Sequence, residues 1–156
     1  MAKSDRMQEL FQARGMKLTP QRQRILEVLA ESEGHPTAEA VCSTVREKMP
    51  TVSLKTVYQT LHDLYEFGGV LQLDLGTGST RFDPNTSGSH HHLVCDICGN
   101  ISDVELRESA EELIGVSVDG FKVERVEIVL RGRCTNCQDL VGDRVPTAKA
   151  HLSAGS

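Results

Sequence analysis

Two cysteine pairs constrain this chain more than any other feature of its sequence. Cys95 and Cys98 are separated by two residues, and the same spacing recurs in Cys134 and Cys137. Four thiolates in two such pairs complete a tetrahedral shell, a geometry that selects Zn²⁺ over harder ions. Redox-active dithiols are the competing interpretation, but one pair would suffice for that chemistry. The sequence therefore predicts a structural zinc bound by these four cysteines.

The length and composition of the chain agree with a small protein that a bound metal stabilises. A chain of 156 residues can hold one ordinary domain or two small ones, and a small second domain needs a staple such as zinc. Five cysteines in a reducing compartment favour metal thiolates over disulfides. No apolar run approaches the ~20 residues of a membrane span, and the first ten residues lack the apolar core of a signal peptide. We therefore expect a soluble, cytoplasmic protein with no membrane partner.

Charge is distributed unevenly along the chain. The net charge is −5, yet residues 1–24 hold six Lys or Arg against two Asp or Glu. From residue 84 onward, seven Lys or Arg face eleven Asp or Glu. This asymmetry indicates a basic surface on one part of an acidic protein, although an ordinary solvated helix face would give the same pattern.

Residues 1–84 read as short helices followed by a hairpin. Apolar periodicity, capping residues and glycine stops predict helices over 5–13, 20–32 and 54–67, and a further helix between Thr37 and Pro50. Two extended runs at 70–75 and 80–83 flank a Gly-Thr-Gly-Ser turn and predict a β-hairpin. This order is typical of a winged helix-turn-helix domain, and a plain helical bundle with a hairpin is the alternative.

In a winged helix the recognition helix would be residues 53–67, which enters the major groove. Phosphate contacts should dominate its affinity. The exposed candidates near its N-terminal end are Ser53, Lys55, Thr56 and Gln59, with Tyr58 flanking them.

Residues 85–89 have linker composition, and residues 90–138 form a second unit. We expect strands at 92–95, 101–104 and 123–130 and a helix at 106–116, which together with the first unit give an α+β protein. A three-stranded sheet with one helix leaves an edge and a face exposed, which invites pairing with a second copy. Residues 139–156 are polar and are predicted to form a disordered tail.

Three histidines stand directly before the first cysteine pair. On a strand, His90 and His92 face the same side and His91 faces the other. Two imidazoles on one face make half of a metal site, and imidazole is a different ligand type from thiolate, so a second metal is predicted. Candidates to complete it are Asp83, Asp103 and His35, although a lone His such as His35 is also explained as a surface or capping residue.

Taken together, these motifs resemble the ferric-uptake-regulator family over residues 5–137. The resemblance is carried by residues 18–22 (LTPQR), 56–58 (TVY), 90–99 (HHHLVCDICG) and 132–137 (GRCTNC). It implies a homodimeric, metal-dependent transcriptional repressor with an N-terminal winged helix and a C-terminal dimerisation domain, bound to a double-stranded DNA operator.

The resemblance also implies roles for particular residues. The family's regulatory metal site falls on His35, Asp83, His90, His92 and Asp103, and bridges the two domains. Lys17 would approach the minor groove, Arg22 lies in a family motif on the outer side of the second helix, and Tyr58 would join the recognition contacts.

Three imidazoles and two carboxylates suit Fe²⁺ or Mn²⁺ by ligand hardness. Aspartates at 83 and 103, where iron-sensing members commonly have glutamate, resemble the peroxide-sensing branch, in which H₂O₂ and bound Fe²⁺ oxidise a ligating histidine, here His35 or His90. Mn²⁺ would give a peroxide-insensitive form. The rivals are an iron-responsive repressor, or less readily a zinc- or nickel-responsive one. A zinc hydrolase is the rival from another class, but the sequence lacks an evident general base beside an open zinc, so we expect no enzyme.

Overall fold

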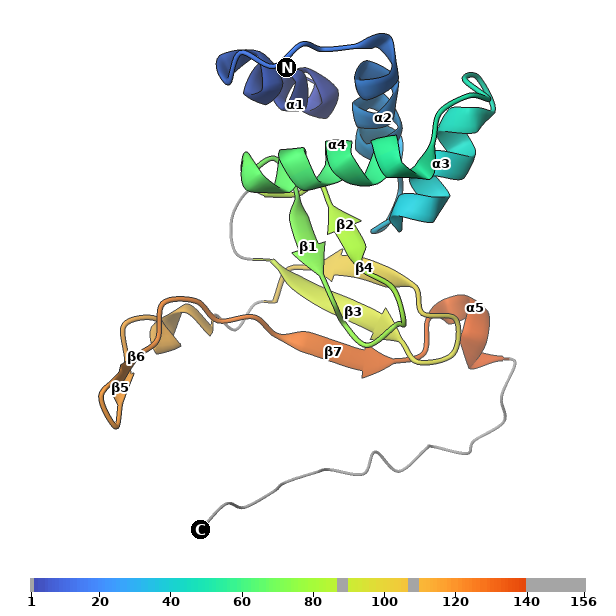
Figure 1. Cartoon of the computed structure of the whole chain (residues 1–156). Helices are drawn as coiled ribbons and strands as arrows, with labels where there is room; N and C mark the ends of the chain where they lie inside the picture. Colours follow the sequence, from blue (N-terminus) through green and yellow to red (C-terminus); the bar gives the residue numbers. More distant parts are fainter. Residues whose placement is uncertain (1, 87–89, 107–109, 140–156) are drawn as a thin grey trace.

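The structure, a computed structural model, describes residues 2–86, 90–106 and 110–139. The helices gather at one end and a three-stranded sheet at the other, with a two-stranded hairpin between them (Figure 1). Among the described residues, no helix is both long and apolar enough to cross a membrane. Of the predicted tail, residues 140–156 lie outside the described residues, as do residues 87–89 of the predicted linker.

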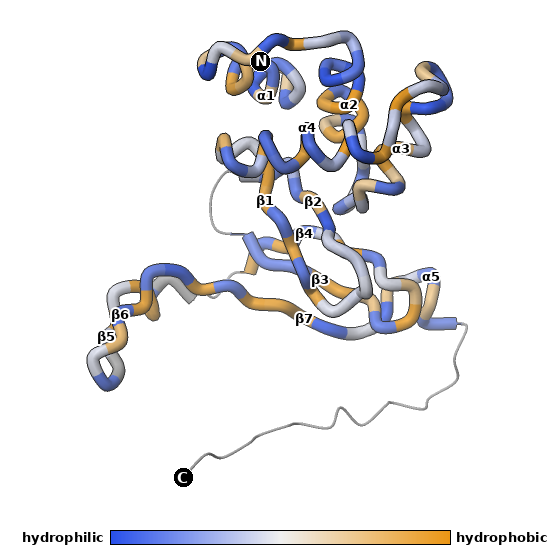
Figure 2. Tube along the Cα trace, viewed as in Figure 1, coloured by the Kyte–Doolittle hydropathy of each residue, from blue (hydrophilic) through white to orange (hydrophobic). Residues whose placement is uncertain are grey.

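Four helices form the first unit: α1 (Lys3–Ala13), α2 (Pro20–Glu31), α3 (Ala38–Arg46) and α4 (Leu54–Glu66). Thr19, Thr37 and Ser53 begin the last three, and the side chain of each accepts a hydrogen bond from the backbone N–H three residues on. Figure 2 shows apolar and polar positions alternating along the helices. Their apolar stripes meet in one core, and the four predicted helices are confirmed.

Strands β1 (Leu71–Leu73) and β2 (Arg81–Asp83) pair antiparallel and form the predicted hairpin beside α4 (Figure 1). Helices followed by this hairpin make a winged helix, in which the hairpin is the wing and α4 is the helix beside it (Figure 1). The sequence-based prediction of this arrangement is confirmed.

The second unit is built on strand β3 (His91–Cys95), which lies between β4 (Ile101–Val104) and β7 (Val129–Gly132). β4 pairs with β3 antiparallel, whereas β7 pairs with it in parallel. The parallel register sets Cys95 opposite Gly132, so the chain leaves β7 beside the first cysteine pair. Helix α5 (Thr135–Gln138) then carries Cys137 back toward it.

Two predictions for the second unit are wrong. Of the helix predicted over 106–116, the described residues form a short 3-10 helix, η1 (Ala110–Leu113), and residues 107–109 lie outside the described residues. A small hairpin, β5 (Ser117–Val118) and β6 (Phe121–Lys122), follows. The strand predicted over 123–130 begins only at Val129. Gly115, whose φ angle is 84°, leaves the helical region inside the expected helix, and Asp119 and Gly120, with φ angles of 49° and 82°, form the turn between β5 and β6.

The wing and the sheet share a small core of their own. Leu73 and Leu75 from the hairpin segment pack with Val94 and Ile101 from the sheet, and the partly buried Leu71 and Val129 extend this cluster. Four buried apolar side chains are few for a self-sufficient core, which is the condition under which a metal staple is needed. The packing also joins the winged-helix unit to the sheet.

The loop before α3 lies directly on strand β4. Gly34 has φ +78°, and a Cβ at this position would lie 3.3 Å from the carbonyl oxygen of Ile101, so a larger residue would be strained and crowded. This close approach brings the next residue, His35, to the junction between the two units.

Arg81 fastens the same junction. Its guanidinium donates one hydrogen bond to the carbonyl of His35 and another to the carbonyl of Gly99, each over 3.2 Å. Gly99 follows directly on Cys98, so Arg81 connects the wing both to the loop before α3 and to the cysteine turn.

Replacing Arg81 by methionine, which keeps most of the aliphatic stem, should lower the free energy of unfolding by about 1–3 kcal/mol, because two partly buried carbonyls lose a charged donor. A urea titration would measure this as a lower midpoint with an unchanged slope. The exposed Arg125, replaced in the same way, is the control and should leave the midpoint where it is. An unaltered midpoint for Arg81→Met would show that these two bonds do not stabilise the junction.

Candidate metal centres and nucleic-acid interface

The four predicted zinc ligands lie together at one end of the sheet. The ligand atoms of Cys95, Cys98, Cys134 and Cys137 all lie within 4.8 Å of one another, and the Sγ atoms of Cys98 and Cys134 are 3.7 Å apart. A tetrahedron with ~2.3 Å metal–sulfur bonds has edges of about 3.8 Å, so the spacing fits Zn²⁺. None of the four forms a disulfide.

The protonation chemistry of this cluster also favours a cation. The backbone N–H groups of Cys134 and Cys98 lower the pKa of Cys95, and the first of these lies 3.4 Å from the Cys95 sulfur. In contrast, the neighbouring Cys134 side chain and burial raise the pKa of Cys137. Four adjacent thiolates repel one another, and a divalent cation is the group that would let all of them ionise.

Three imidazoles and two carboxylates meet at the junction of the wing, the loop before α3 and the sheet. The Nε2 atoms of His35, His90 and His92 each lie between 2.7 and 3.8 Å from both Asp83 Oδ2 and Asp103 Oδ1. An ion with six ligands and ~2.1 Å bonds separates neighbouring ligands by about 3.0 Å and opposite ones by about 4.2 Å, so these spacings suit one shared ion.

Strand geometry explains how the sequence builds this cluster. His92 and Asp103 are paired residues on the antiparallel strands β3 and β4, so their side chains lie on the same face. His90 precedes β3 by one residue and reaches the same Asp83 oxygen as His92, over 2.7 Å against 3.5 Å. His91 faces away and accepts a hydrogen bond from the backbone N–H of Ile128. The predicted alternation of the three histidines is confirmed.

The cluster is shielded from water on all sides but one. The side chains of His35, His90, His92 and Asp83 are between 1 and 8% exposed, whereas that of Asp103 is 35% exposed. The interpretation of His35 as a surface residue is therefore wrong, because Gly34 sets it against the sheet. Asp103 forms the side through which a small molecule could reach the cluster.

One close contact inside the cluster is not a hydrogen bond. His35 Nε2 lies 2.8 Å from Asp103 Oδ1, yet its direction does not satisfy a hydrogen bond. Two atoms that bind the same ion lie close together, but each points at the ion and not at the other. The nitrogen of His35 and the oxygen of Asp103 show this arrangement. Four of the five donors, those of His35, Asp83, His92 and Asp103, lie within 4.8 Å of one another. The residues therefore fit a divalent ion.

Charge in the cluster points the same way. Burial on its own would raise the pKa of Asp83, but the close contact with His35 and the hydrogen bonds from the backbone N–H of Asn85 and from His90 outweigh it and lower that pKa. Burial on its own would lower the pKa of His35, yet the close contact with the negatively charged Asp83 raises it. Both shifts mean that the site stabilises a positive charge beside two carboxylates, and a bound cation would supply it.

The predicted DNA-contact residues are distributed over the exposed side of α4 and the loop before α2. Lys17, Lys55 and Gln59 are exposed, and Lys55, Tyr58 and Gln59 line a hollow between α4 and the wing. Gln59 also donates to Asp63, over 2.8 Å.

The other predicted contacts have structural roles as well. The Ser53 hydroxyl caps α4 and lies 2.9 Å from that of Thr56, while the Tyr58 hydroxyl donates to Glu39 on α3 over 2.7 Å. Arg22 is half-buried and donates to the carbonyl of Lys17 over 2.8 Å. The Arg22 side chain therefore stabilises the loop before α2 in addition to its predicted DNA contact.

Sequence reasoning missed two residues at the cluster. Asn85, assigned to a featureless linker, contacts both carboxylates, and Arg81 binds the carbonyl of His35. The Asp-Pro-Asn run is a signal that could have found Asn85, because an aspartate side chain often accepts the backbone N–H two residues on. For Arg81 the sequence holds no comparable signal.

The first unit is a winged helix, and the sheet of the second unit carries a four-cysteine site. Imidazoles and carboxylates from both units form a second metal site between them. Together these features define a metal-dependent transcriptional regulator. Comparison with known proteins agrees. The sequence model of the "Ferric uptake regulator family" matches residues 13–131. This chain belongs to the ferric uptake regulator family.

Individual relatives refine the comparison. The peroxide operon regulator of Bacillus subtilis (strain 168) is 38% identical over 130 residues, which cover 83% of this chain and 89% of that protein. The Helicobacter pylori ferric uptake regulator Fur, with a TM-score of 0.72 and 22% identity over 87% of this chain and 91% of that one, shares the fold. The ferric uptake regulator from Pseudomonas aeruginosa, solved with manganese, has a TM-score of 0.65 and 26% identity over 86% of this chain and 99% of that one.

Proposed function

We propose that this protein is a homodimeric repressor that binds operator DNA when a regulatory metal occupies the His/Asp cluster. In this proposal Cys95, Cys98, Cys134 and Cys137 hold a structural Zn²⁺. Fe²⁺ or Mn²⁺ is held by His35, Asp83, His90, His92 and Asp103. The convergence of three imidazoles and two carboxylates from both units on one point is the observation that carries the proposal.

We divide the chain into a DNA-binding domain (residues 1–84), a linker (85–89) and a dimerisation and metal-binding domain (90–138). His35 and Asp83 belong to the first domain, whereas His90, His92 and Asp103 belong to the second. A ligand that needs donors from both domains binds only when they are docked, so it shifts the population toward that arrangement by its difference in affinity for the two. Metal binding would thereby fix the orientation in which two recognition helices reach adjacent major grooves.

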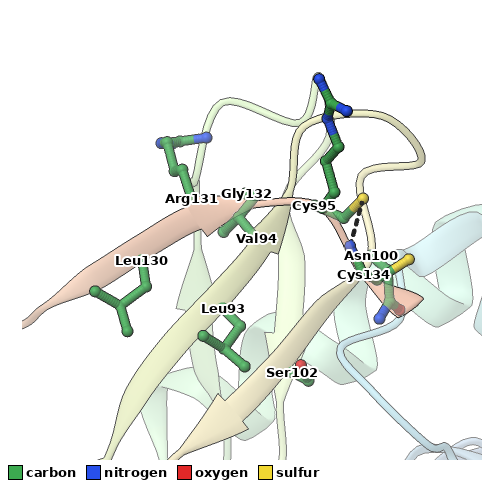
Figure 3. A pocket seen from close by; sticks show the side chains of 10 residues that line it. Leu93, Val94, Cys95, Asn100, Ser102, Leu130, Arg131, Gly132 and Cys134 are labelled. Carbon is green, nitrogen blue, oxygen red and sulfur yellow. Dashed lines mark hydrogen bonds between the residues drawn. The ribbon is translucent and has the colours of Figure 1, made fainter. Parts of the chain in front are cut away.

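The sheet supports the dimer in this proposal. One face packs against the wing, while the other carries Leu93 and Leu130, which are paired across β3 and β7 and are both 39% exposed (Figure 3). The segment from η1 to β6 (residues 110–122) adds Leu113, Ile114 and Phe121, and the side chain of Phe121 is 71% exposed. Apolar groups of this extent on a small unit are typical of a surface that a partner covers, and a second copy would bury the same patch on both sides.

DNA binding rests on α4 and the wing. We propose contacts from Lys17, Arg22, Ser53, Lys55, Thr56, Tyr58 and Gln59, with Lys17 and Lys55 serving the phosphates. A repressor of chromosomal operators acts in the cytoplasm, where thiolates also stay reduced. A regulator rather than a zinc hydrolase is favoured because the family and the similar proteins are regulators.

The signal we propose is peroxide. The similarity to the peroxide operon regulator of Bacillus subtilis supports this choice. Bound Fe²⁺ would supply the redox chemistry that breaks the O–O bond of H₂O₂, so that one oxygen would be transferred to a ring carbon of an adjacent imidazole and the other would leave as water. His35 and His90 present the Nε2 atoms nearest to the carboxylates, at 2.8 Å and 2.7 Å. Once oxidised, such a ring is a weaker ligand, and the two domains lose a donor that joins them. An iron-responsive repressor without this chemistry is the second candidate.

Replacing Asp103 by glutamate should keep metal-dependent DNA binding but slow the release of DNA after H₂O₂ by on the order of 10- to 100-fold. A displacement of about 1 Å at a reacting group has that effect. The rate of DNA release after a fixed dose of H₂O₂ measures it. Asp74→Glu, a substitution of an exposed wing residue, is the control and should behave as wild type. Equal release rates for wild type, Asp103→Glu and Asp74→Glu would show that the length of the side chain at position 103 does not affect peroxide sensing.

Metal-dependent DNA binding is tested directly with a duplex selected by the Mn²⁺-loaded protein from a random library. At fixed salt, affinity should rise by at least about 100-fold when Mn²⁺ is added to protein that retains zinc, a coupling at the upper end of the usual range. Equal affinity with and without Mn²⁺ would contradict the proposal.

A further inference from the structure

Asn85 holds the oxygens of both cluster carboxylates that the histidines do not use. Its backbone N–H donates to Asp83 Oδ1 over 2.7 Å, and its side-chain amide donates to Asp103 Oδ2 over 3.2 Å. The opposite oxygens, Asp83 Oδ2 and Asp103 Oδ1, are the ones that face the three imidazoles. In each carboxylate, one oxygen therefore faces the imidazoles and the other accepts a hydrogen bond from Asn85.

The chemistry fixes the direction of both bonds. A carboxylate only accepts hydrogen bonds, so the amide of Asn85 must turn its Nδ2 toward Asp103. The backbone bond is the Asx-type contact that an aspartate makes with the N–H two residues on. Pro84, between the two residues, keeps Asp83 extended and so helps to present this N–H.

The amide bond to Asp103 also crosses the junction, whereas the backbone bond to Asp83 is local. Asp83 ends strand β2 of the wing, Asp103 lies on strand β4, and Asn85 follows the wing at the start of the linker. Asp103 is the most exposed member of the cluster, and rotation about its side-chain bonds would otherwise exchange its two oxygens. The amide of Asn85 stops that exchange.

We propose that Asn85 is a positioning residue of the regulatory metal site, which holds Asp83 and Asp103 as ligands through one oxygen each. The inference rests on the proposed function, because it needs a metal at the His/Asp cluster. With each carboxylate limited to one oxygen, the cluster offers five donor atoms, and a six-coordinate ion keeps one position for a small molecule. The 35% exposed side of the cluster, at Asp103, is where that position would open.

The test compares Mn²⁺ affinity in zinc-loaded full-length protein. Asn85→Ala keeps the backbone bond to Asp83 but removes the amide that holds Asp103. We expect its Kd for Mn²⁺ to rise by about tenfold or more, the usual consequence of losing an outer partner of a ligand. Thr86→Ala, one residue along the same segment, should bind like wild type, and Asn85→Gln, which keeps an amide donor, should recover part of the loss.

A second readout separates positioning from a general loss of structure. The infrared difference spectrum between Mn²⁺-loaded and metal-free protein reports whether carboxylates bind through one oxygen or two. Wild type should show the one-oxygen pattern, and Asn85→Ala should gain a two-oxygen component, since Asp103 Oδ2 is then released.

Three results would overturn the inference. A Kd for Asn85→Ala within twofold of wild type would do so, as would an equal loss in Thr86→Ala, which would indicate an effect of the segment. An unchanged infrared spectrum would exclude positioning of the oxygens. If wild type itself binds no Mn²⁺, or if Asp83→Asn binds it equally well, the proposed metal site fails together with this inference. Tight wild-type binding with no effect at Asn85 would remove the inference alone.

Discussion

Cys95→Ser is expected to lose the bound zinc, unfold the second domain and abolish the dimer. A structural zinc contributes on the order of 10 kcal/mol to the folding of a small domain, and whole domains are stable by only about 5–15 kcal/mol. The apolar cluster that joins sheet and wing has only four buried members, so it cannot replace that contribution. Zinc content by atomic absorption and oligomeric state by sedimentation would measure the effect.

Cys42→Ala is the matched control for this experiment. Cys42 is buried in the helical core, on α3, and does not belong to the thiolate cluster. Its replacement by alanine should therefore leave both zinc content and the dimer intact. A well-folded, dimeric Cys95→Ser protein without zinc would refute the staple argument.

Asp83→Asn is expected to abolish metal-dependent DNA binding while leaving zinc and the fold in place. Asp83 Oδ2 lies within 2.7 to 3.5 Å of all three Nε2 atoms, so it is the common partner of the imidazoles. The substitution removes its charge at almost constant volume. Affinity for Mn²⁺ should fall by more than about 100-fold, because losing even an outer partner of a ligand costs 10- to 100-fold.

The control for Asp83 is Asp74→Asn, an exposed carboxylate of the same wing that bonds only locally, to the backbone N–H of Gly76. Fluorescence anisotropy with the selected duplex, with and without Mn²⁺, would compare the two variants at equal zinc content. If Asp83→Asn retained its Mn²⁺-dependent affinity, the regulatory metal would have to lie elsewhere.

The sequence predicted the winged helix well because its signals are local. Thr19, Thr37 and Ser53 each cap a helix, and apolar periodicity in the intervening segments fixed which side turned inward. The cysteine spacing predicted the thiolate cluster for the same reason, since each pair is local: Cys95 and Cys98 span the turn after β3, and Cys134 and Cys137 lie in the first turn of α5. These features need no knowledge of distant contacts.

Other features depend on contacts between distant residues, and the sequence did not reveal them. The helix expected over 106–116 is reduced to η1 in the described residues, and Gly115, whose φ angle is 84°, leaves the helical region. The late start of β7 follows from its parallel register with β3, which no periodicity encodes. Asn85 looked like linker, and its role became visible only when Asp103, on another strand, came within 3.2 Å of its amide.

Peroxide sensing is the central claim, and mass spectrometry of digested protein tests it most directly. Protein loaded with Fe²⁺ and protein loaded with Mn²⁺ would receive a brief dose of H₂O₂ while DNA binding is followed in parallel. The account predicts one added oxygen on the peptide that contains His35 or His90, only with Fe²⁺ and together with release of DNA. Unmodified histidines with retained DNA binding in the Fe²⁺-loaded protein would contradict it, and would leave a repressor that responds to metal alone.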